Sequence, residues 1–224
     1  MDLELQDRVI LVVGGTGLIG SAVVERMRAE GATVVAASRH DGLVMDATDD
    51  ASVQAAIERL LAEHGRIDGL VVAAAPSART LDPSRNSEPA QALAAFDAKA
   101  MSFLRVANSV LPAMTGAGFG RIVGVSGQNA FQTGNITGSV RNAALVIVAK
   151  NLADSVAGSG VTVNAVSPGI VVDEPSTEIA LGRSGQCSPA QIADLIALLL
   201  SPRTGTISGE SIAVGHRVRG ATGL

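Results

Sequence analysis

The sequence predicts an α/β protein, a single domain built on a doubly wound, parallel, Rossmann-like sheet with helices on both faces. Short apolar runs rich in branched residues alternate with segments of helical length along all 224 residues, as in strand–helix–strand units. A glycine-rich turn joins the first apolar run to the first helical segment. Apolar residues form 47% of the chain and aromatic residues only 2%, so Ala, Val, Leu and Ile must build the core, as in buried parallel sheets.

The first half of the chain holds four predicted strands and two predicted helices. The strands are short runs of β-branched and other apolar residues, and the helices have apolar residues at helical spacing and end at a glycine. An aspartate at position 49 or 50 supplies a cap for the second helix. In order, the elements are a strand at Arg8 to Val13, a helix at Leu18 to Gly31, strands at Thr33 to Ser38 and Leu43 to Asp46, a helix at Asp49 to Gly65 and a strand at Gly69 to Ala75.

A polar loop rich in Pro and Ser, from Pro76 to Pro89, opens the second half. The same patterns then predict three more strands and three more helices. They are a long helix from about Ala90 to Met114, a strand at Arg121 to Ser126, a helix from about Gly138 to Ala157, a strand at Val161 to Ser167, a helix from about Pro189 to Leu200 and a strand at Ser211 to Val214. Neither a linker nor a repeat interrupts the series, so residues 1–224 are expected to form one domain.

Composition excludes several classes of partner. The net charge of −4 argues against nucleic acid, because a phosphate backbone requires a basic face. The acidic start "MDLELQDR" is unlike a secretory signal, and the apolar run "IADLIALLL" is too short to span a bilayer. Cys187 is the single cysteine, so neither a disulfide framework nor a cysteine metal site is expected. We expect a cytoplasmic protein that binds neither membrane nor metal.

The stretch "VVGGTGLIGSAV" carries the first functional prediction. Gly15, Gly17 and Gly20 form the pattern G-x-G-x-x-G between a strand and a helix, which is the context that a dinucleotide-binding turn requires. The glycines permit a tight turn and close approach of a pyrophosphate, which then faces the helix N-terminus. The alternative is a tight turn that serves only the fold. The predicted contacts are Gly14, Gly15, Thr16, Gly17, Leu18, Ile19 and Gly20.

The end of the second strand indicates which dinucleotide would bind. An acidic residue there would hydrogen-bond the adenosine ribose and repel a 2′-phosphate. This chain instead has Ser38 and Arg39, and a guanidinium can fork onto a phosphate. The pair favours NADP(H) over NAD(H), although NAD remains possible because Asp41 follows closely. The alternative for Arg39 is an ordinary solvated arginine.

The chain resembles the short-chain dehydrogenase/reductase family over essentially its full length. The matching pieces are the glycine turn, "VMDATDDASV", "IDGLVVAAAP", "GRIVGVSG", "NAALVIVAKNLA" and "VTVNAVSPGIV". The resemblance implies that Asp46 contacts the adenine, that Ala47, Ala73 and Ala74 lie along the cofactor, and that Pro168, Gly169 and Ile170 receive the nicotinamide carboxamide. It also implies a small-molecule substrate and a homodimer or homotetramer.

Members of this family usually work with a tyrosine as proton donor, assisted by a lysine, a serine and an asparagine. On the matching positions, the asparagine falls on Lys99 and the serine on Gly127, directly after Ser126. The lysine falls on Asn142 and the tyrosine on Gly138, and the chain has no Tyr. An alternative register on Phe131 and Asn135 supplies neither group. The family's usual proton donor is therefore expected to be missing, with a void at Gly138.

Three residues are the candidates for a replacement catalytic group. Lys99, if buried, would have a lowered pKa and could act as an acid near neutral pH; the alternative is a lysine on a helix surface. Ser126 could hydrogen-bond a substrate carbonyl, and Asn142 a ribose hydroxyl. Arg141 is expected to point away from Asn142 on the helix. His216 is interpreted as a surface residue.

Three functions remain open on the sequence. The first is an NADP(H)-dependent oxidoreductase, acting by carbonyl or enone reduction or alcohol oxidation, with a non-standard or missing proton donor. The second is a non-redox enzyme on the same fold, a cyclase, dehydratase or isomerase that uses polar groups such as Gln128 and Asn129. The third is a catalytically silent protein that binds NADP or a partner. Fold alone does not decide between them.

Overall fold

The computed structural model describes residues 1–75 and 80–220. Their main feature is a seven-stranded sheet in the order β3-β2-β1-β4-β5-β6-β9, with every pair parallel. The strands are β1 (Val9–Val13), β2 (Thr33–Ser38), β3 (Leu43–Val44), β4 (Gly69–Val72), β5 (Gly120–Val125), β6 (Val161–Pro168) and β9 (Ser211–Val214). From β1, the chain adds β2 and then β3 on one side. The next strand, β4, lies on the opposite side of β1, so the strand order reverses between β1 and β4.

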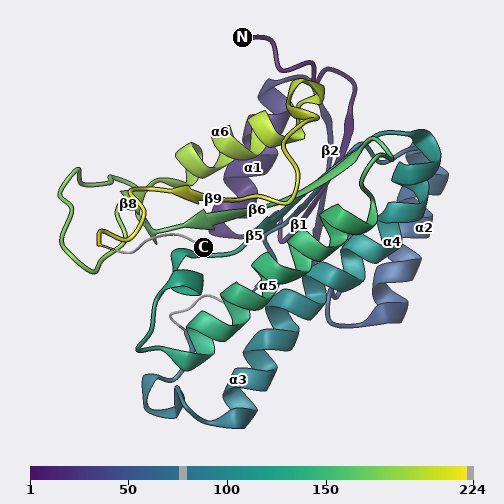
Figure 1. The fold of residues 1–224 in the computed structure, drawn as a ribbon. Helices are drawn as coiled ribbons and strands as arrows, with labels where there is room; N and C mark the ends of the chain where they lie inside the picture. The colour runs from purple at the N-terminus through teal and green to yellow at the C-terminus, as the bar shows by residue number, and fades with distance from the viewer. Residues whose placement is uncertain (76–79, 221–224) are drawn as a thin grey trace.

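Helices cover both faces of the sheet (Figure 1). One face carries α1 (Leu18–Ala29) and α6 (Pro189–Leu200), and the other carries α2 (Asp50–His64), α4 (Ser102–Ala117) and α5 (Ile136–Ser155). Alternate side chains of the central strands enter two separate apolar cores, one beneath each helix layer. Because β1 and β4 are buried on both faces, their continuous apolar sequence has a direct structural cause. The predicted fold class is confirmed.

Two predicted elements differ from the structure, and one pair of strands was not predicted. The expected helix from Ala90 to Met114 consists of three consecutive segments: α3 (Pro89–Phe96), a π-helical turn (Asp97–Met101) and α4. The helix is continuous, but its middle turn has π-helical hydrogen bonding. The third strand holds only two residues. A small parallel pair, β7 (Ile170–Val171) with β8 (Gln186–Cys187), was not predicted, since two-residue strands leave no periodic pattern. Part of the expected loop, residues 76–79, lies outside the described residues.

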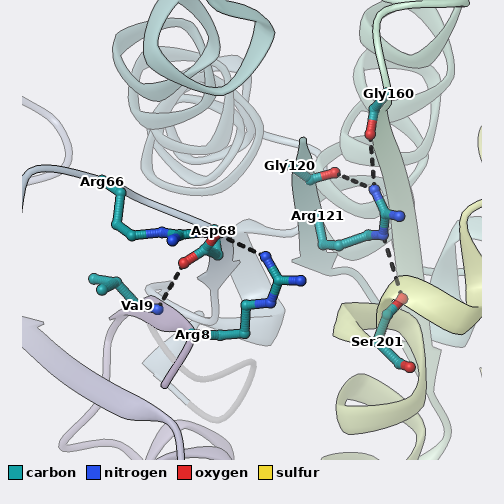
Figure 2. A network of polar contacts seen from close by, with 8 residues as sticks. All are labelled: Arg8, Val9, Arg66, Asp68, Gly120, Arg121, Gly160 and Ser201. Atoms are coloured by element: carbon teal, nitrogen blue, oxygen red, sulfur yellow. Dashed lines mark hydrogen bonds and ion pairs between the residues drawn. The ribbon is translucent and has the colours of Figure 1, made fainter. Parts of the chain in front are cut away.

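A polar network fastens the edge of the sheet where β1 and β4 begin (Figure 2). The buried carboxylate of Asp68 accepts a hydrogen bond of 2.9 Å from the Val9 amide. It also pairs with the guanidinium groups of Arg8 and Arg66. Asp68 thus joins the two strands at the point where the sheet order reverses.

Arg121 at the start of β5 extends this fastening toward β6 and α6. Its guanidinium donates to the carbonyl oxygens of Gly120, Gly160 and Ser201 at 2.8, 2.9 and 3.3 Å (Figure 2). The Phe119 ring lies between Arg121 and Arg8, 4.4 and 4.3 Å from their guanidinium carbons. These contacts stabilise the amino-terminal edge of the sheet and leave the carboxyl-terminal edge to the candidate site.

Candidate functional site

Three adjoining cavities follow the carboxyl-terminal edge of the sheet. The first, here the nucleotide cavity, has a volume of about 470 Å³ and lies beside the ends of β1 and β2. The second, the central cavity, has about 430 Å³ and shares Ala73 and Ala75 with the first. The third, the outer cavity, has about 620 Å³ and shares residues 128–129 and 168–170 with the central one. In an open parallel sheet, this edge at the reversal of strand order is where ligands bind.

The glycine turn between β1 and α1 packs closely against the strand ends. Gly14 has a φ of +81°, and a Cβ there would lie 2.7 Å from the Ala74 amide nitrogen. A Cβ at Gly20 would overlap the carbonyl oxygen of Gly14. These two glycines are therefore required by packing alone. Gly17 precedes α1 and supplies no side-chain cap to that helix, so the first amides of α1 lack a side-chain acceptor, as in anion-binding turns.

The nucleotide cavity collects the residues predicted to read the adenosine end. Ser38 exchanges hydrogen bonds with the backbone of Asp41 and so holds the turn after β2, while Arg39 lies exposed on the lining. Asp46 accepts from the Thr48 amide and hydroxyl at 2.9 and 2.7 Å, which lowers the pKa of its carboxyl group. The predicted residues that line this cavity are Gly14, Thr16, Ser38, Arg39, Asp46, Ala47, Ala73 and Ala74.

The central cavity brings the three catalytic candidates together. Lys99, Ser126 and Asn142 come from the π-helical turn, the end of β5 and α5, and all three are buried. Of the predicted cofactor contacts, the same lining includes Leu18, Ile19, Ala73, Pro168, Gly169 and Ile170. Gly15 and Gly17, in the turn, and Gly20, in the first turn of α1, line none of the three cavities.

Lys99 is buried, with 7% of its surface exposed. The alternative of a lysine on the helix surface is therefore wrong, because the π-helical turn directs position 99 toward the sheet. Its ammonium group donates to the Ser126 carbonyl oxygen at 2.9 Å. Burial, with a smaller contribution from the charge of Arg141, lowers the pKa of Lys99 to about 7. The site thus contains an amine that can exchange a proton near neutral pH.

Ser126 and Asn142 are tied to the backbone around Lys99. The Ser126 hydroxyl donates to the Asn142 carbonyl oxygen at 2.9 Å, so its proton is already engaged within the protein. The Asn142 side-chain amide donates to the Gly138 carbonyl oxygen, also at 2.9 Å. Its buried Oδ1 atom has no hydrogen-bond partner among the described residues. A buried acceptor of this kind is costly unless a ligand supplies the donor.

Two expectations about α5 are wrong. No void is left at Gly138, because Asn135 caps the helix by accepting from the Gly138 amide at 2.7 Å. A Cβ at Gly138 would lie 3.0 Å from the Asn135 side chain and 3.2 Å from that of Asn129. Arg141 does not point away from Asn142, since both line the central cavity. Neighbouring positions on a helix are separated by about 100°, so both fit on one buried side.

The loop after β5 carries no sequence pattern that predicts the contacts of its side chains. Gln128 is buried and donates to the Val214 and Gly215 carbonyl oxygens at 3.2 and 3.4 Å. It also accepts from the Val218 amide at 3.0 Å. Its side chain therefore holds the C-terminal segment against the site. His216 is exposed, as predicted. Arg141 lines the central cavity, a position that the expected direction of its side chain on the helix did not predict.

Across the part of the chain that the structure describes, no helix is both long and apolar enough to cross a membrane. A parallel sheet with a glycine turn after its first strand and polar side chains at the strand ends defines the Rossmann-like class. Within that class, the family model described as enoyl-(acyl carrier protein) reductase matches residues 15–216. The chain belongs to this family of short-chain dehydrogenases/reductases.

Curated relatives and solved structures match over nearly the whole chain. The 3-oxoacyl-[acyl-carrier-protein] reductase FabG of Escherichia coli is 27% identical, over 95% of this chain and 97% of that protein. The structure of Thermoplasma acidophilum aldohexose dehydrogenase aligns with a TM-score of 0.80 and 23% identity, over 96% and 94% of the two chains. A Brucella melitensis structure described as ribose-5-phosphate isomerase gives 0.84 and 24%, over 96% and 93%. At these identities, the two structures show the fold alone.

Proposed function

We propose that this chain, acting as one domain, is an NADP(H)-dependent oxidoreductase that interconverts a small carbonyl or enone compound and its reduced product. Lys99 is the proton donor in this proposal. The observation that carries it is a buried amine, with a pKa lowered to about 7, in the cavity next to the glycine turn. The name of the Escherichia coli relative, a 3-oxoacyl reductase, supports carbonyl chemistry.

The described residues fit a dinucleotide in the nucleotide and central cavities. The uncapped N-terminus of α1 would face the pyrophosphate, and Arg39 would fork onto a 2′-phosphate. Asp46 would hold the adenine end of the dinucleotide, and the backbone at residues 168–170 would hold its nicotinamide end. The Asn142 Oδ1 atom, buried without a partner among the described residues, would accept from a ribose hydroxyl. When bound, NADPH supplies the hydride.

Lys99 then has one task, which is to supply a proton to the carbonyl oxygen as that oxygen gains negative charge. A positioned acid accelerates such a step by roughly two to four powers of ten. Ser126 acts as a positioning residue, because its carbonyl oxygen holds the Lys99 ammonium at 2.9 Å. After transfer, the neutral amine regains its proton from water. Reduction should therefore slow above the pKa of Lys99, tenfold for each further pH unit.

The test is NADPH oxidation by a panel of aldehydes, ketones and enones, followed by the loss of nicotinamide absorbance. Lys99→Met should lower kcat by at least about a hundredfold without weakening NADPH binding. Lys150→Met is the matched control, since Lys150 is exposed on α5, and it should keep full activity. Unchanged turnover in Lys99→Met would remove Lys99 as the donor.

The same assay separates the two other functions. Turnover of a substrate without any change in nicotinamide absorbance would favour a non-redox enzyme. The packing of Asn135 and Asn129 against Gly138 offers no enlarged pocket for such chemistry. Saturable NADPH binding without turnover of any compound would favour a silent binding protein.

We also propose a homodimer or homotetramer. Val140 and Ile147 lie seven positions apart on α5 and expose 45% and 62% of their surfaces. Residues at this spacing share one helix face, so they offer an apolar stripe to a second copy. Sedimentation of the purified chain tests this, with Ile147→Glu expected to shift the mass toward the monomer.

A further inference from the structure

The hydrogen bonds around Lys99 satisfy a neutral amine better than an ammonium group. An ammonium group carries three donors, yet within residues 1–75 and 80–220 the only acceptor bonded to the Lys99 nitrogen is the Ser126 carbonyl oxygen, at 2.9 Å. Of the ion pairs formed between described residues, none includes Lys99. Loss of the proton removes a buried charge and an unused donor while keeping the bond to Ser126, so burial favours the neutral amine.

The space beside this amine can receive a small molecule. Lys99 is buried but lines the central cavity, which has a volume of about 430 Å³. The described lining contains neither Asp nor Glu, and its charged members are Lys99 and Arg141. Arg141, on α5, favours the neutral form, since its charge contributes to the lowered pKa of Lys99. No described carboxylate of the lining therefore holds the amine in its charged form.

A neutral, desolvated amine beside a cavity is a nucleophile toward carbonyl compounds. The sequence contains one other lysine, Lys150. That lysine lies exposed on α5 and pairs with the Asp154 carboxylate. The two side chains differ in both burial and pairing, so Lys150 is an internal reference for the reactivity of Lys99.

We propose that the central cavity captures small aldehydes covalently, as imines of the Lys99 amine. The nitrogen lone pair attacks the carbonyl carbon, and the π electrons of the C=O bond move to oxygen. A proton passes from nitrogen to that oxygen to give a carbinolamine, and loss of one water forms the C=N bond. The step is reversible and needs neither oxidant nor reductant. It goes beyond the proposed reductase, in which protonated Lys99 acts, because it requires no nucleotide.

The test traps this imine in the wild-type chain without nucleotide. Butanal and sodium cyanoborohydride are added near neutral pH, so that an imine is reduced to a butylamine whose position peptide mass spectrometry reports. Lys99 should be butylated at least about tenfold faster than Lys150, because desolvation makes an amine nucleophilic at neutral pH. Butylation of Lys150 at the same rate as Lys99, or without Lys99, would overturn the proposal.

The same reaction in urea shows whether the preference belongs to the folded cavity. In the unfolded chain the two lysines should react at similar rates, and a preference for Lys99 that persisted there would assign it to the local sequence and reject the cavity. In the folded state, Lys150→Met should keep the labelling of Lys99. Lys99→Met, the matched variant, should leave only Lys150 and the N-terminal amine to react, and undiminished total labelling of this variant would also contradict the proposal.

The imine and the proposed function fail separately. Butylation of Lys99 without NADPH oxidation by any carbonyl compound rejects only the oxidoreductase. NADPH oxidation without butylation of Lys99 rejects only the imine.

Discussion

The burial of Lys99 lowers the pKa of its side-chain amine. Its pKa is lowered from 10.5 to about 7, chiefly by loss of water. Between these two pH values the unfolded chain holds the proton and the folded chain does not, so the free energy of unfolding rises with pH across this window. Each unit of pKa displacement corresponds to about 1.4 kcal/mol, giving a gain of about 4 to 5 kcal/mol from pH 7 to 10.5.

Lys99→Met removes this titration. The stability of the wild-type chain relative to Lys99→Met should therefore increase as the pH rises from 7 toward 10. Urea denaturation of both proteins at several pH values measures the difference, in which all other titrating groups cancel. A constant difference between the two proteins would show that Lys99 keeps an ordinary pKa.

In the proposed function, Arg39 determines the preference for NADP(H) over NAD(H). It lies exposed on the nucleotide cavity, next to the turn that Ser38 holds. Arg39→Ala should weaken NADPH binding by about tenfold or more, as for a lost charge-assisted hydrogen bond, with little effect on NADH. Arg28→Ala, an exposed arginine near the end of α1, is the control and should change neither. Equal losses for both nucleotides would exclude the phosphate role.

At the scale of elements, the π-helical turn between α3 and α4 decides what the site contains. Five residues, Asp97–Met101, take this form and direct Lys99 to the end of β5. Such turns occur often at functional sites. The sequence offered one continuous apolar helix here, and its periodicity could not distinguish a surface lysine from a buried one. The burial of Lys99 therefore became known only from the structure and could not be predicted from the periodicity of the sequence.

The start of α5 is the second element that shapes the site. Asn135 caps the helix through the Gly138 amide and fills the space beside Gly138. Asn135→Ala should cost about 1 kcal/mol of stability, measured by urea denaturation. Asn151→Ala, an exposed asparagine within the same helix, should cost less. If Asn135→Ala were no more destabilising than this control, the cap would not hold the helix start.

At the scale of the whole molecule, the sheet has one edge for stability and one for the candidate site. Asp68 fastens β1 to β4 at the amino-terminal edge. Asp68→Ala should destabilise the chain by about 3 kcal/mol, because it leaves a buried amide and two cations without their partner. Asp194→Ala, which removes an exposed ion pair with Arg26, should cost about 1 kcal/mol or less.

Because Asp68 lies at the opposite edge from the cavities, its loss should not alter the chemistry. NADPH affinity per folded molecule should be unchanged in Asp68→Ala, measured well below its melting temperature. A change in affinity without loss of folded protein would contradict this separation of the two edges.

The order of strands and helices followed from sequence patterns, because strand runs such as Val9–Val13 and the glycine turn have local signals. The grouping of Lys99, Ser126 and Asn142 followed from their matching family positions. The direction of Arg141 and the filling of the space at Gly138 did not follow, since both depend on how the start of α5 packs against the sheet edge. Side-chain hydrogen bonds such as that from Asn135 are set by tertiary structure and not by spacing.

The central proposal is that the nucleotide and central cavities together bind NADP(H). Its most direct test is equilibrium titration of the wild-type chain with NADPH and, separately, with NADH, followed by nicotinamide fluorescence. The chain has no Trp and no Tyr, so its own emission does not interfere. We predict saturable binding of NADPH, at least about tenfold tighter than that of NADH, as a charge-assisted contact to the 2′-phosphate would give. The absence of saturable binding by either nucleotide would contradict the account.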